Sequence, residues 1–499
     1  MSRGVPIPLR DFHGGVNTKA ADSLVGIDEC RNCSNVVSTS RGSIKKRNGC
    51  QTFSSGFTSS PTQIMSLAGI EVVGPNLVAT ALTKIYSIGT TGTNADITGA
   101  AVSGSNSRWE IIEAPTSGGQ GPVYMMNGTD PNLYWTGAGN VVAWTAASGT
   151  LPVGKYCIYW KNKVWVAGIA ANPSRLFWSD VGDPRAWPAA NVVDLDPNDG
   201  DIITGLGTFG PYLLVFKRNK VFRIYDLNTG ANTTLSTSVG AASHRSIVET
   251  PLGTFFLTND KGVYLYNGST LRQLSEKITP TLSGIVAANR ENAAGIYFQD
   301  HYYLSISTTG STNNLTLDYD AQLDSWWFHT NTSNQWVLWR RTNIYELFAA
   351  EAAAGIVDFC YQPGITQDNG ANFTCLWLGP WLTFGGLYRH RPWEQPYENK
   401  RWRQVQFDGA GIVDVYLGKD YFGQTLLKAD LFNGNATATT FGGGDSFGGG
   451  GIFGDIGAQT RARVYSEGVA RAFSVQFQAS SVNSFEVDAY TPFITPRTN

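Results

Sequence analysis

Four carboxylates lie close together in the segment DLDPNDGD, and closely spaced carboxylates on a loop can bind calcium. They are Asp194, Asp196, Asp199 and Asp201. The segment departs from the EF-hand pattern, because Gly200 comes one place late and the twelfth position holds Gly205 instead of glutamate. We therefore interpret it as a solvated loop between strands, and keep a calcium loop as the alternative.

A Cys-x-x-Cys pair, Cys30 and Cys33, is the second pattern with metal-ligand spacing. Cys50 follows it, but the nearest fourth ligand, His13, lies upstream in a glycine-rich segment and not at zinc-finger spacing. The six cysteines are also too few and too scattered for a disulfide scaffold. We expect reduced thiols here, with a zinc site as the alternative.

The segment YRHRPWEQPYENKRWR, residues 388–403, interleaves cations with aromatic rings, as proteins that bind single-stranded nucleic acid do. Glu394 and Glu398 weaken its positive field. Since Trp and Arg also anchor protein interfaces, we predict a subunit interface or domain junction, with nucleic-acid contact as the alternative. The candidate interface residues are Arg389, Arg391, Trp393, Arg401, Trp402 and Arg403.

Motifs for nucleotide binding and hydrolysis are missing from the sequence. It contains no GxxxxGK[ST], no GxGxxG between a strand and a helix, no GxSxG and no HExxH, and its five histidines are scattered singly. The segment SDVGDPRAW, residues 179–187, departs in both spacings from the Asp-box of sialidase-type propellers. We expect a protein that is not an enzyme and uses no cofactor.

Composition favours strands over helices. The 499 residues include 56 Gly, 15 Trp, 21 Tyr and 25 Phe, but only 4 Met and 15% charged residues. The net charge of -2 comes without a polybasic block that would hold DNA tightly, so any DNA partner would be passed along and not gripped. The N-terminal residues lack the apolar core of a secretory signal, so a cytoplasm-like compartment is expected until assembly.

Apolar segments of about five residues recur about every 40 to 50 residues, and turn residues separate them. The clearest are residues 77–81, 122–126, 163–167, 212–217, 254–258, 302–306 and 344–349. A unit of that length with four short strands is typical of a propeller blade, which buries its faces against its neighbours. The sequence therefore predicts an all-β protein with a β-propeller of six or seven blades; a stack of sandwiches is the alternative.

Turns and helices complete this interpretation. Arg218-Asn219 is predicted to form the turn of one β-hairpin, and residues 259–262 are predicted to form the turn of another. Only residues 285–294 and 351–354 have a helical pattern, and both segments are short.

Three regions follow from these patterns. Residues 1–60 are predicted to form an extended N-terminal arm or a blade-closing segment, and residues 61–372 the propeller. Residues 373–499 are predicted to form a C-terminal β-sandwich that contains a glycine-rich loop at residues 441–455.

Several segments together resemble one family, in the same order along the chain. DFHGGVN from Asp11 and NCSNVVSTSRGSIKKRNG from Asn32 resemble its opening "GGvn … N … G … kRxG" segment. YCIYWKNKVWVAG and SRLFWSDVGDPRAWP, within residues 156–188, resemble the "rlfvag … rvywS … gdpe.W" pattern of its blades, and residues 240–268 and 315–329 resemble later blades in style. The family is that of the tail nozzle or tail tubular B proteins of short-tailed phages, including packaged-DNA stabilisation proteins.

The resemblance implies a virion protein, assembled in the host cytoplasm, that forms a homo-oligomeric and commonly hexameric ring. Such a ring stacks below the portal and adaptor proteins, forms the distal conduit for double-stranded DNA, retains the packaged genome and releases it on ejection. Contact with the host envelope is a further expected partnership. The chain is shorter than the larger tubular proteins, and residues 441–455 match nothing in the family pattern.

Two other functions remain open at this point. A carbohydrate-binding or carbohydrate-cleaving propeller, such as a receptor-binding tail component, would place aromatic platforms and a carboxylate pair at the central mouth. A cellular scaffold of the WD type would carry GH and WD repeat signals, which the sequence lacks.

Overall fold

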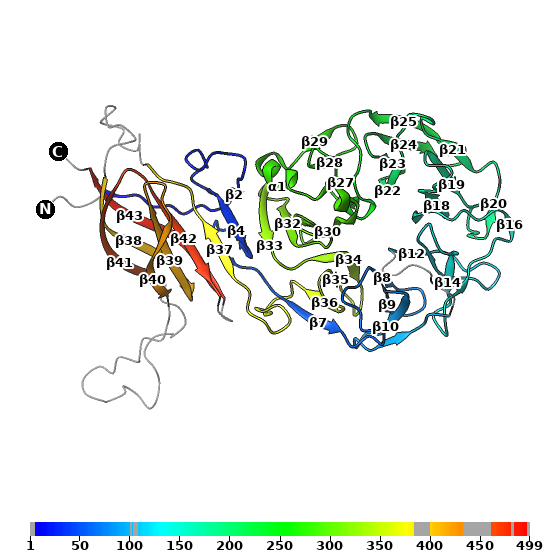
Figure 1. Ribbon diagram of the computed structural model, residues 1–499, viewed down its shortest axis with the longest axis horizontal. Coiled ribbons are helices and arrows are strands. Elements are labelled where there is room, and N and C mark those ends of the chain that lie inside the picture. The colour runs from blue at the N-terminus through cyan, green and yellow to red at the C-terminus, as the bar shows by residue number, and fades with distance from the viewer. Residues whose placement is uncertain are drawn as a thin grey trace. The chain divides into compact units, whose positions relative to one another are not determined.

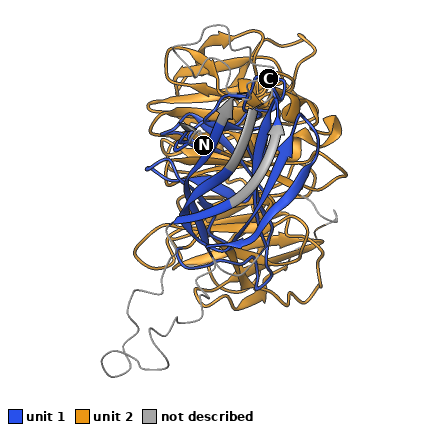
Figure 2. Ribbon diagram, turned by 90° about the vertical axis from the view of Figure 1, so that its left-hand side faces the viewer, with its two compact units in different colours: residues 1–49, 319–329, 363–499 blue, residues 50–318, 330–362 orange. Residues whose placement is uncertain are grey.

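A computed structural model describes residues 5–99, 102, 108–383, 400–432, 461–480 and 484–496. These residues fall into two compact units (Figure 2). Unit 1 comprises residues 1–49, 319–329 and 363–499, and unit 2 comprises residues 50–318 and 330–362. In the described part of the chain, no helix has the length and apolar character needed to cross a membrane.

Seven four-stranded antiparallel sheets follow one another along the chain. The first sheet contains β8 (Ser66–Ile70), β9 (Asn76–Ala81), β10 (Lys84–Ile88) and β11 (Asn94–Asp96), the second β12 (Glu110–Glu113), β13 (Val123–Met126), β14 (Leu133–Trp135) and β15 (Val142–Ala143), and the third β17 (Tyr156–Trp160), β18 (Lys163–Ala167), β19 (Arg175–Trp178) and β21 (Val192–Asp194). The fourth sheet contains β22 (Ile203–Phe209), β23 (Tyr212–Lys217), β24 (Val221–Asp226) and β25 (Ala231–Ser236), and the fifth β26 (Val248–Thr250), β27 (Gly253–Leu257), β28 (Val263–Tyr266) and β29 (Leu271–Gln273). The sixth sheet contains β30 (Ala294–Phe298), β31 (His301–Ile306), β32 (Leu315–Asp320) and β33 (Ser325–His329), and the seventh β34 (Ser333–Trp339), β35 (Glu346–Glu351), β36 (Val357–Cys360) and β7 (Cys50–Ser54).

The first strands of these sheets form a closed ring. Each contacts the next, in the order β8, β12, β17, β22, β26, β30 and β34, and β34 contacts β8 again. Figure 1 shows the sheets of unit 2 arranged around this ring. The last sheet takes its fourth strand, β7, from the N-terminal side of the propeller, so the two ends of the propeller sequence are joined by strand pairing. The architecture is a seven-bladed β-propeller, which confirms the predicted fold class.

The seven apolar segments of the sequence are the second strands of the seven blades, β9, β13, β18, β23, β27, β31 and β35. Nearly all of their residues are buried, as in β13 and β18, because each sheet packs against a neighbour on both faces. Between the last and first blades, for example, Trp339 and Phe348 pack with Leu77 in one cluster. Burial between blades explains why these strands have continuous apolar sequences.

Short elements connect the blades. β16 (Ser148–Gly149) pairs in parallel with β20 (Ala186–Trp187). Within the described residues the helical segments are η1 (His244–Ser246), η2 (Glu276–Ile278), α1 (Thr279–Ser283) and η3 (Ala287–Asn292). The helix predicted at residues 285–294 is only the short η3, and the one predicted at residues 351–354 is wrong, because β35 runs to Glu351 and a bend follows. Both predicted turns lie between paired strands, β23 with β24 and β27 with β28.

Unit 1 contains two larger sheets. One has the order β41 (Arg461–Ala470), β38 (Lys400–Gly411), β43 (Phe485–Pro496), β6 (Ile44–Lys46) and β5 (Val36–Ser38), and β1 (Val5–Pro6) also pairs with β43. The other has the order β4 (Asn32–Ser34), β37 (Cys375–Leu378), β42 (Phe473–Ala479), β39 (Val413–Lys419) and β40 (Gln424–Leu431). β2 (Gly15–Val16) pairs in parallel with β3 (Glu29–Cys30).

Aromatic side chains join the two sheets of unit 1 into a sandwich. Phe477 of β42 contacts Phe407 of β38 and Tyr490 of β43, with ring centroids 6.0 Å apart in each pair. Trp377 of β37 and Phe12 add rings to the same layer, 5.1 Å apart. All of these side chains are buried, as the inner faces of packed sheets require.

The division of the chain differs from the three predicted regions. Residues 1–60 are not a separate arm: β1 and β4 to β6 are strands of the sandwich sheets, whereas β7 closes the propeller. The propeller unit begins at Cys50 instead of residue 61 and ends at Gln362 instead of residue 372. Residues 319–329 are grouped with unit 1, although they contain β33, which pairs within the sixth blade as predicted for the propeller.

Candidate functional site

Each of the four carboxylates of the acidic segment has partners within the protein. Asp194 accepts two hydrogen bonds from the Arg175 guanidinium, each 2.7 Å long. Asp199 accepts from the ammonium groups of Lys217 and Lys220. Lys220 also pairs with Asp196.

Asp201 accepts hydrogen bonds from backbone N–H groups at Ile202, Arg218 and Asn219. Among the described residues, no group of three His, Cys, Asp or Glu side chains is placed to hold a metal ion. Asp199 has a structural role, because it neutralises Lys217, whose side chain is fully buried. Burial alone would raise the pKa of the Asp199 carboxyl, but hydrogen bonds from Lys217 and Lys220 outweigh it and lower this pKa to about 2.

Four of the six cysteines form two neighbouring pairs. Burial and then Cys33 raise the pKa of the Cys30 thiol, and burial and then Cys50 raise that of Cys360. All six cysteines are buried. His13 instead approaches Asp11 and the carbonyl oxygen of Thr39.

The candidate interface residues are placed only in part. Arg389, Arg391 and Trp393 lie outside the described residues, as do residues 441–455. Arg401, Trp402 and Arg403 lie on β38, where the backbone of Arg401 pairs with Val469 and Thr495. Their role at an interface stays a prediction.

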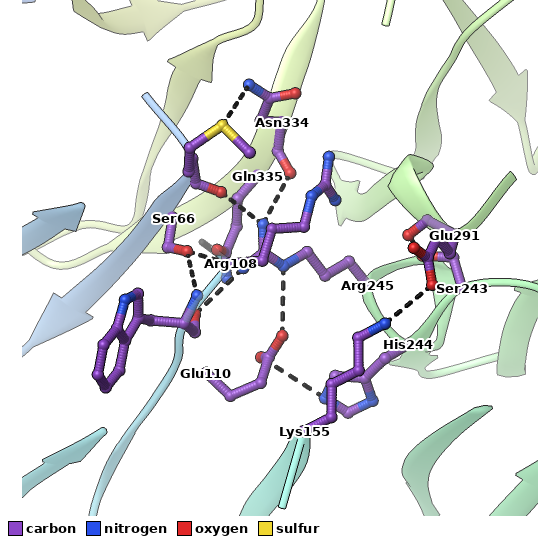
Figure 3. A network of polar contacts seen from close by, with 12 residues as sticks. Ser66, Arg108, Glu110, Lys155, Ser243, His244, Arg245, Glu291, Asn334 and Gln335 are labelled. Carbon is purple, nitrogen blue, oxygen red and sulfur yellow. Dashed lines mark hydrogen bonds and ion pairs between the residues drawn. The ribbon is translucent and has the colours of Figure 1, made fainter. Parts of the chain in front are cut away.

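The axis of the propeller holds a network of polar side chains that the sequence analysis did not single out (Figure 3). Its centre is Arg245 on η1, just before the fifth blade, and only 9% of this residue is exposed. Its guanidinium donates hydrogen bonds to the carbonyl oxygens of Met65, Asn334 and Trp109, and to the hydroxyl of Ser66. One side chain therefore joins the entry of the fifth blade to the inner ends of the first, second and seventh blades.

Glu110 on β12 supplies the counter-charge. Its carboxylate accepts from Arg245 Nε at 3.3 Å, and its second oxygen lies 3.6 Å from His244 Nε2. His244 Nδ1 accepts a hydrogen bond from the backbone N–H of Leu206, which assigns the proton of the neutral ring to Nε2. Burial lowers the pKa of His244 although Glu110 opposes the shift, so this imidazole is neutral at neutral pH.

A second ion pair lies beside this network. Lys155 Nζ donates to Glu291 Oε2 at 2.8 Å (Figure 3). Burial would lower the pKa of Lys155, but Tyr156 and Glu291 outweigh it and raise this pKa. Arg108 also lies here and donates a hydrogen bond to the carbonyl oxygen of Asn292 at 3.2 Å.

Three cavities follow one another along the axis, and each shares lining residues with the next. The first, which we call the aromatic cavity, has a volume of about 410 Å³ and is lined by Tyr159, Trp160, Trp336, Glu110 and Glu249 among others. A small cavity of about 40 Å³ follows, around Arg108, Glu110, His244 and Arg245.

The third, which we call the cationic cavity, has a volume of about 760 Å³. Its charged lining residues are Lys155, Arg218, Arg290 and Glu291. The Arg245 network therefore separates an aromatic end of the axis from a cationic end.

The lining of the two larger cavities suits binding of two different kinds of ligand. The aromatic cavity presents rings and carboxylates, and the cationic cavity presents guanidinium groups, which suit sugars and anions respectively. The sequence contained one signal for it: SHRS, residues 243–246, is a polar run shortly before β26. Glu110 and Lys155 carried no local signal, because their partners come from other blades.

Fold and site together define a β-propeller protein with a polar, cavity-flanked axis. No family model matches the chain, and no curated protein sequence does either. Solved structures do match, but at low identity, so the likeness shows the fold alone.

The structure of streptogramin B lyase is 13% identical, covers 63% of this chain and 98% of its own, and has a TM-score of 0.44. YCF48 bound to D1 peptide is 10% identical, covers 66% and 98%, and has a TM-score of 0.40. BamB from Moraxella catarrhalis is 15% identical, covers 72% and 98%, and has a TM-score of 0.38. These neighbours include an enzyme beside proteins of other kinds.

Proposed function

We propose that this chain is a non-catalytic structural subunit of a bacteriophage tail, of the nozzle or tail tubular type. In this proposal it assembles in the host cytoplasm into a ring of identical copies, most simply a hexamer, and meets the portal, the adaptor and other tail proteins. The ring forms the distal conduit, which retains the packaged genome and lets it pass on ejection.

The observation that carries the proposal is where the family-like segments fall in the fold. Residues 32–49 contain β4, β5 and β6, and residues 156–188 contain the inner hairpin of the third blade. Residues 240–268 contain η1 with Arg245 and the first three strands of the fifth blade. The resemblance therefore follows elements that build the two units, including the residue at the centre of the propeller.

Side chains block the axis of each propeller, so a DNA conduit cannot run along that axis. Arg245 bonds to several blades across the axis, and the aromatic cavity beside it measures only about 410 Å³. A DNA duplex, whose major groove alone is about 12 Å wide, does not fit there. In this proposal DNA passes between copies in a ring, and the net charge of -2 lets it slide without being held.

Mass spectrometry of purified phage particles tests the structural role. We expect peptides of this chain in the particle, in several copies for each portal ring. Their absence from the particle, while the chain is abundant in the infected cell, would contradict the proposal.

The aromatic cavity supports a second candidate function, a receptor-binding propeller that recognises carbohydrate. It combines the rings of Tyr159, Trp160 and Trp336 with the carboxylates of Glu110 and Glu249, as a sugar site requires. Glu249 is already engaged, because it accepts hydrogen bonds from the Thr208 hydroxyl and the Gly210 backbone. Glycan-array binding that Trp160→Ala abolishes would favour this function, and no binding to any glycan would exclude it.

A further inference from the structure

The cationic cavity has more positive than negative charge. Three cations, Lys155, Arg218 and Arg290, line it against one carboxylate, Glu291, and Lys155 is already paired with that carboxylate. Among the described residues, no carboxylate forms an ion pair with Arg218 or Arg290. Two guanidinium groups therefore line the cavity without forming an ion pair within the described residues.

A third guanidinium lies behind them. Arg108 lines the small cavity that shares Lys155, Tyr156 and Glu291 with the cationic cavity. Its one hydrogen bond within the described chain goes to a neutral carbonyl oxygen, that of Asn292, although a guanidinium has five N–H donors. Burial and then Arg245 lower the pKa of Arg108, and the carboxylates of Glu110 and Glu291 only partly oppose this shift.

The positions of these groups give the cavity its direction. Arg218 and Asn259 lie in the turns between the second and third strands of the fourth and fifth blades, and Arg290 lies on η3, before the sixth blade. The turns between the second and third strands of all blades lie at the same end of a propeller, because neighbouring strands within a blade are antiparallel. The cavity is thus the mouth of the axis at that end.

We propose that this mouth binds a small phosphorylated polyol, such as a sugar phosphate. Its volume of about 760 Å³ lies within the range of small-molecule sites, about 300–1,000 Å³. Guanidinium groups match phosphate oxygens in pairs, and Arg218 and Arg290 are the groups free to do so. Thr129 and Asn259, whose side chains form no bond within the described chain, supply partners for hydroxyl groups.

Calorimetric titration of the purified full chain tests this proposal, with ribose 5-phosphate, ribose, inorganic phosphate and a thymidine 12-mer as probes. We expect ribose 5-phosphate to bind more tightly than ribose or phosphate alone. The double variant Arg218→Gln, Arg290→Gln should weaken this binding at least about tenfold. Arg340→Gln serves as the matched control, since Arg340 is exposed and follows β34 at the opposite end of the propeller; it should bind like the native chain.

Three results would overturn the proposal. They are no binding of ribose 5-phosphate, binding that the double variant leaves unchanged while its unfolding midpoint is native, and binding of the thymidine 12-mer alone. The last result would assign the cavity to nucleic acid. None of these results depends on whether the chain is a tail protein.

A different observation carries a second inference, at the closure of the propeller. Cys50 begins β7, and Cys360 ends β36 directly opposite it. Residues opposite each other in an antiparallel pair have Cα atoms about 4.5–5.5 Å apart, within the disulfide range of about 4.4–6.8 Å. Both residues are buried and belong to unit 2.

We infer that Cys50 and Cys360 can be oxidised to a disulfide that holds the propeller closed, which we call the redox latch. A small disulfide such as oxidised glutathione is the oxidant: the two thiols lose two protons and two electrons, one sulfur–sulfur bond forms between them, and the glutathione disulfide becomes two thiols. The new bond joins the first strand of the propeller sequence to its last. The raised pKa of Cys360 makes this exchange slow in the folded chain.

Mass spectrometry after incubation with oxidised glutathione tests the latch. We expect a linked peptide pair containing Cys50 and Cys360, and a raised thermal midpoint that Cys50→Ser removes and Cys157→Ser does not. Glutathione attached to Cys50 or Cys360 without any internal link would overturn it, as would an unchanged midpoint in the linked chain.

Discussion

The guanidinium of Arg245 donates a hydrogen bond to the carbonyl oxygen of Met65 over 2.6 Å, although the two residues belong to different parts of the propeller sequence. Met65 directly precedes the first blade, and Arg245 directly precedes the fifth. The same guanidinium reaches Trp109 and Asn334. Closure of the propeller therefore depends on the inner ends of its blades as well as on the strand pair of β7 and β36.

Replacing Arg245 by methionine tests this dependence. The change leaves the Glu110 carboxylate and several buried carbonyl oxygens without their donor, so we expect a loss of about 3–5 kcal/mol in the free energy of unfolding. Urea denaturation followed by tryptophan fluorescence measures it. Arg340→Met, at an exposed position, should change stability by less than about 0.5 kcal/mol. Equal stability of the two variants would show that the network does not hold the blades.

His244 predicts a pH dependence. Burial lowers the pKa of His244 in the folded chain. Below the unfolded pKa of about 6.5 the unfolded chain therefore binds more protons than the folded chain, and the protein becomes less stable as the pH falls. We expect His244→Gln to flatten the decline in stability between about pH 6.5 and 5. Unfolding midpoints measured across this range test it, and an unchanged slope in the variant would contradict the assignment of this titration to His244.

Asp199 predicts a separate acid-sensitive step. Its folded pKa of about 2 lies below the unfolded value of about 3.9, so its contribution is complete above about pH 4 and is lost as pH falls toward 2. Asp199→Asn should remove this part of the acid response. At neutral pH it should cost about 3 kcal/mol, because Lys217 remains buried and charged.

Lys217→Met is the matched comparison for Asp199→Asn. It removes the buried charge and leaves Asp199 with Lys220, so we expect a smaller loss of stability. Urea denaturation at pH 7 ranks the two variants. A larger loss in Lys217→Met would contradict the view that the acidic segment serves to neutralise this lysine.

The second strands of the blades could be predicted from the sequence because both of their faces are buried. β18 and β23 have continuous apolar sequences that match the predicted residues 163–167 and 212–217. The first strands give a less regular signal: β17 reads YCIYW, but β12 reads EIIE, and the residues of β12 are only partly buried because they line the axis. The recurring apolar segments therefore predicted a propeller of six or seven blades, and the structure shows that there are seven.

The site and the domain division could not be predicted in the same way. Arg245, Glu110 and Asn334 meet only because the ring closes, and no local pattern encodes a contact across it. The N-terminal strands are two to five residues long, too short for periodicity to assign them to a sheet. The acidic segment stands out in the sequence, but its partner Lys217 does not. Lys217 is the last residue of the apolar strand β23, and no sequence pattern predicts that it pairs with the acidic segment.

Electron microscopy of the purified chain, alone and mixed with its portal and adaptor proteins, tests the central claim most directly. We expect a closed ring of identical copies. Its axial opening, formed between copies, should be wide enough for a DNA duplex, while each propeller axis is filled at Arg245. A chain that stays monomeric in both samples would contradict it.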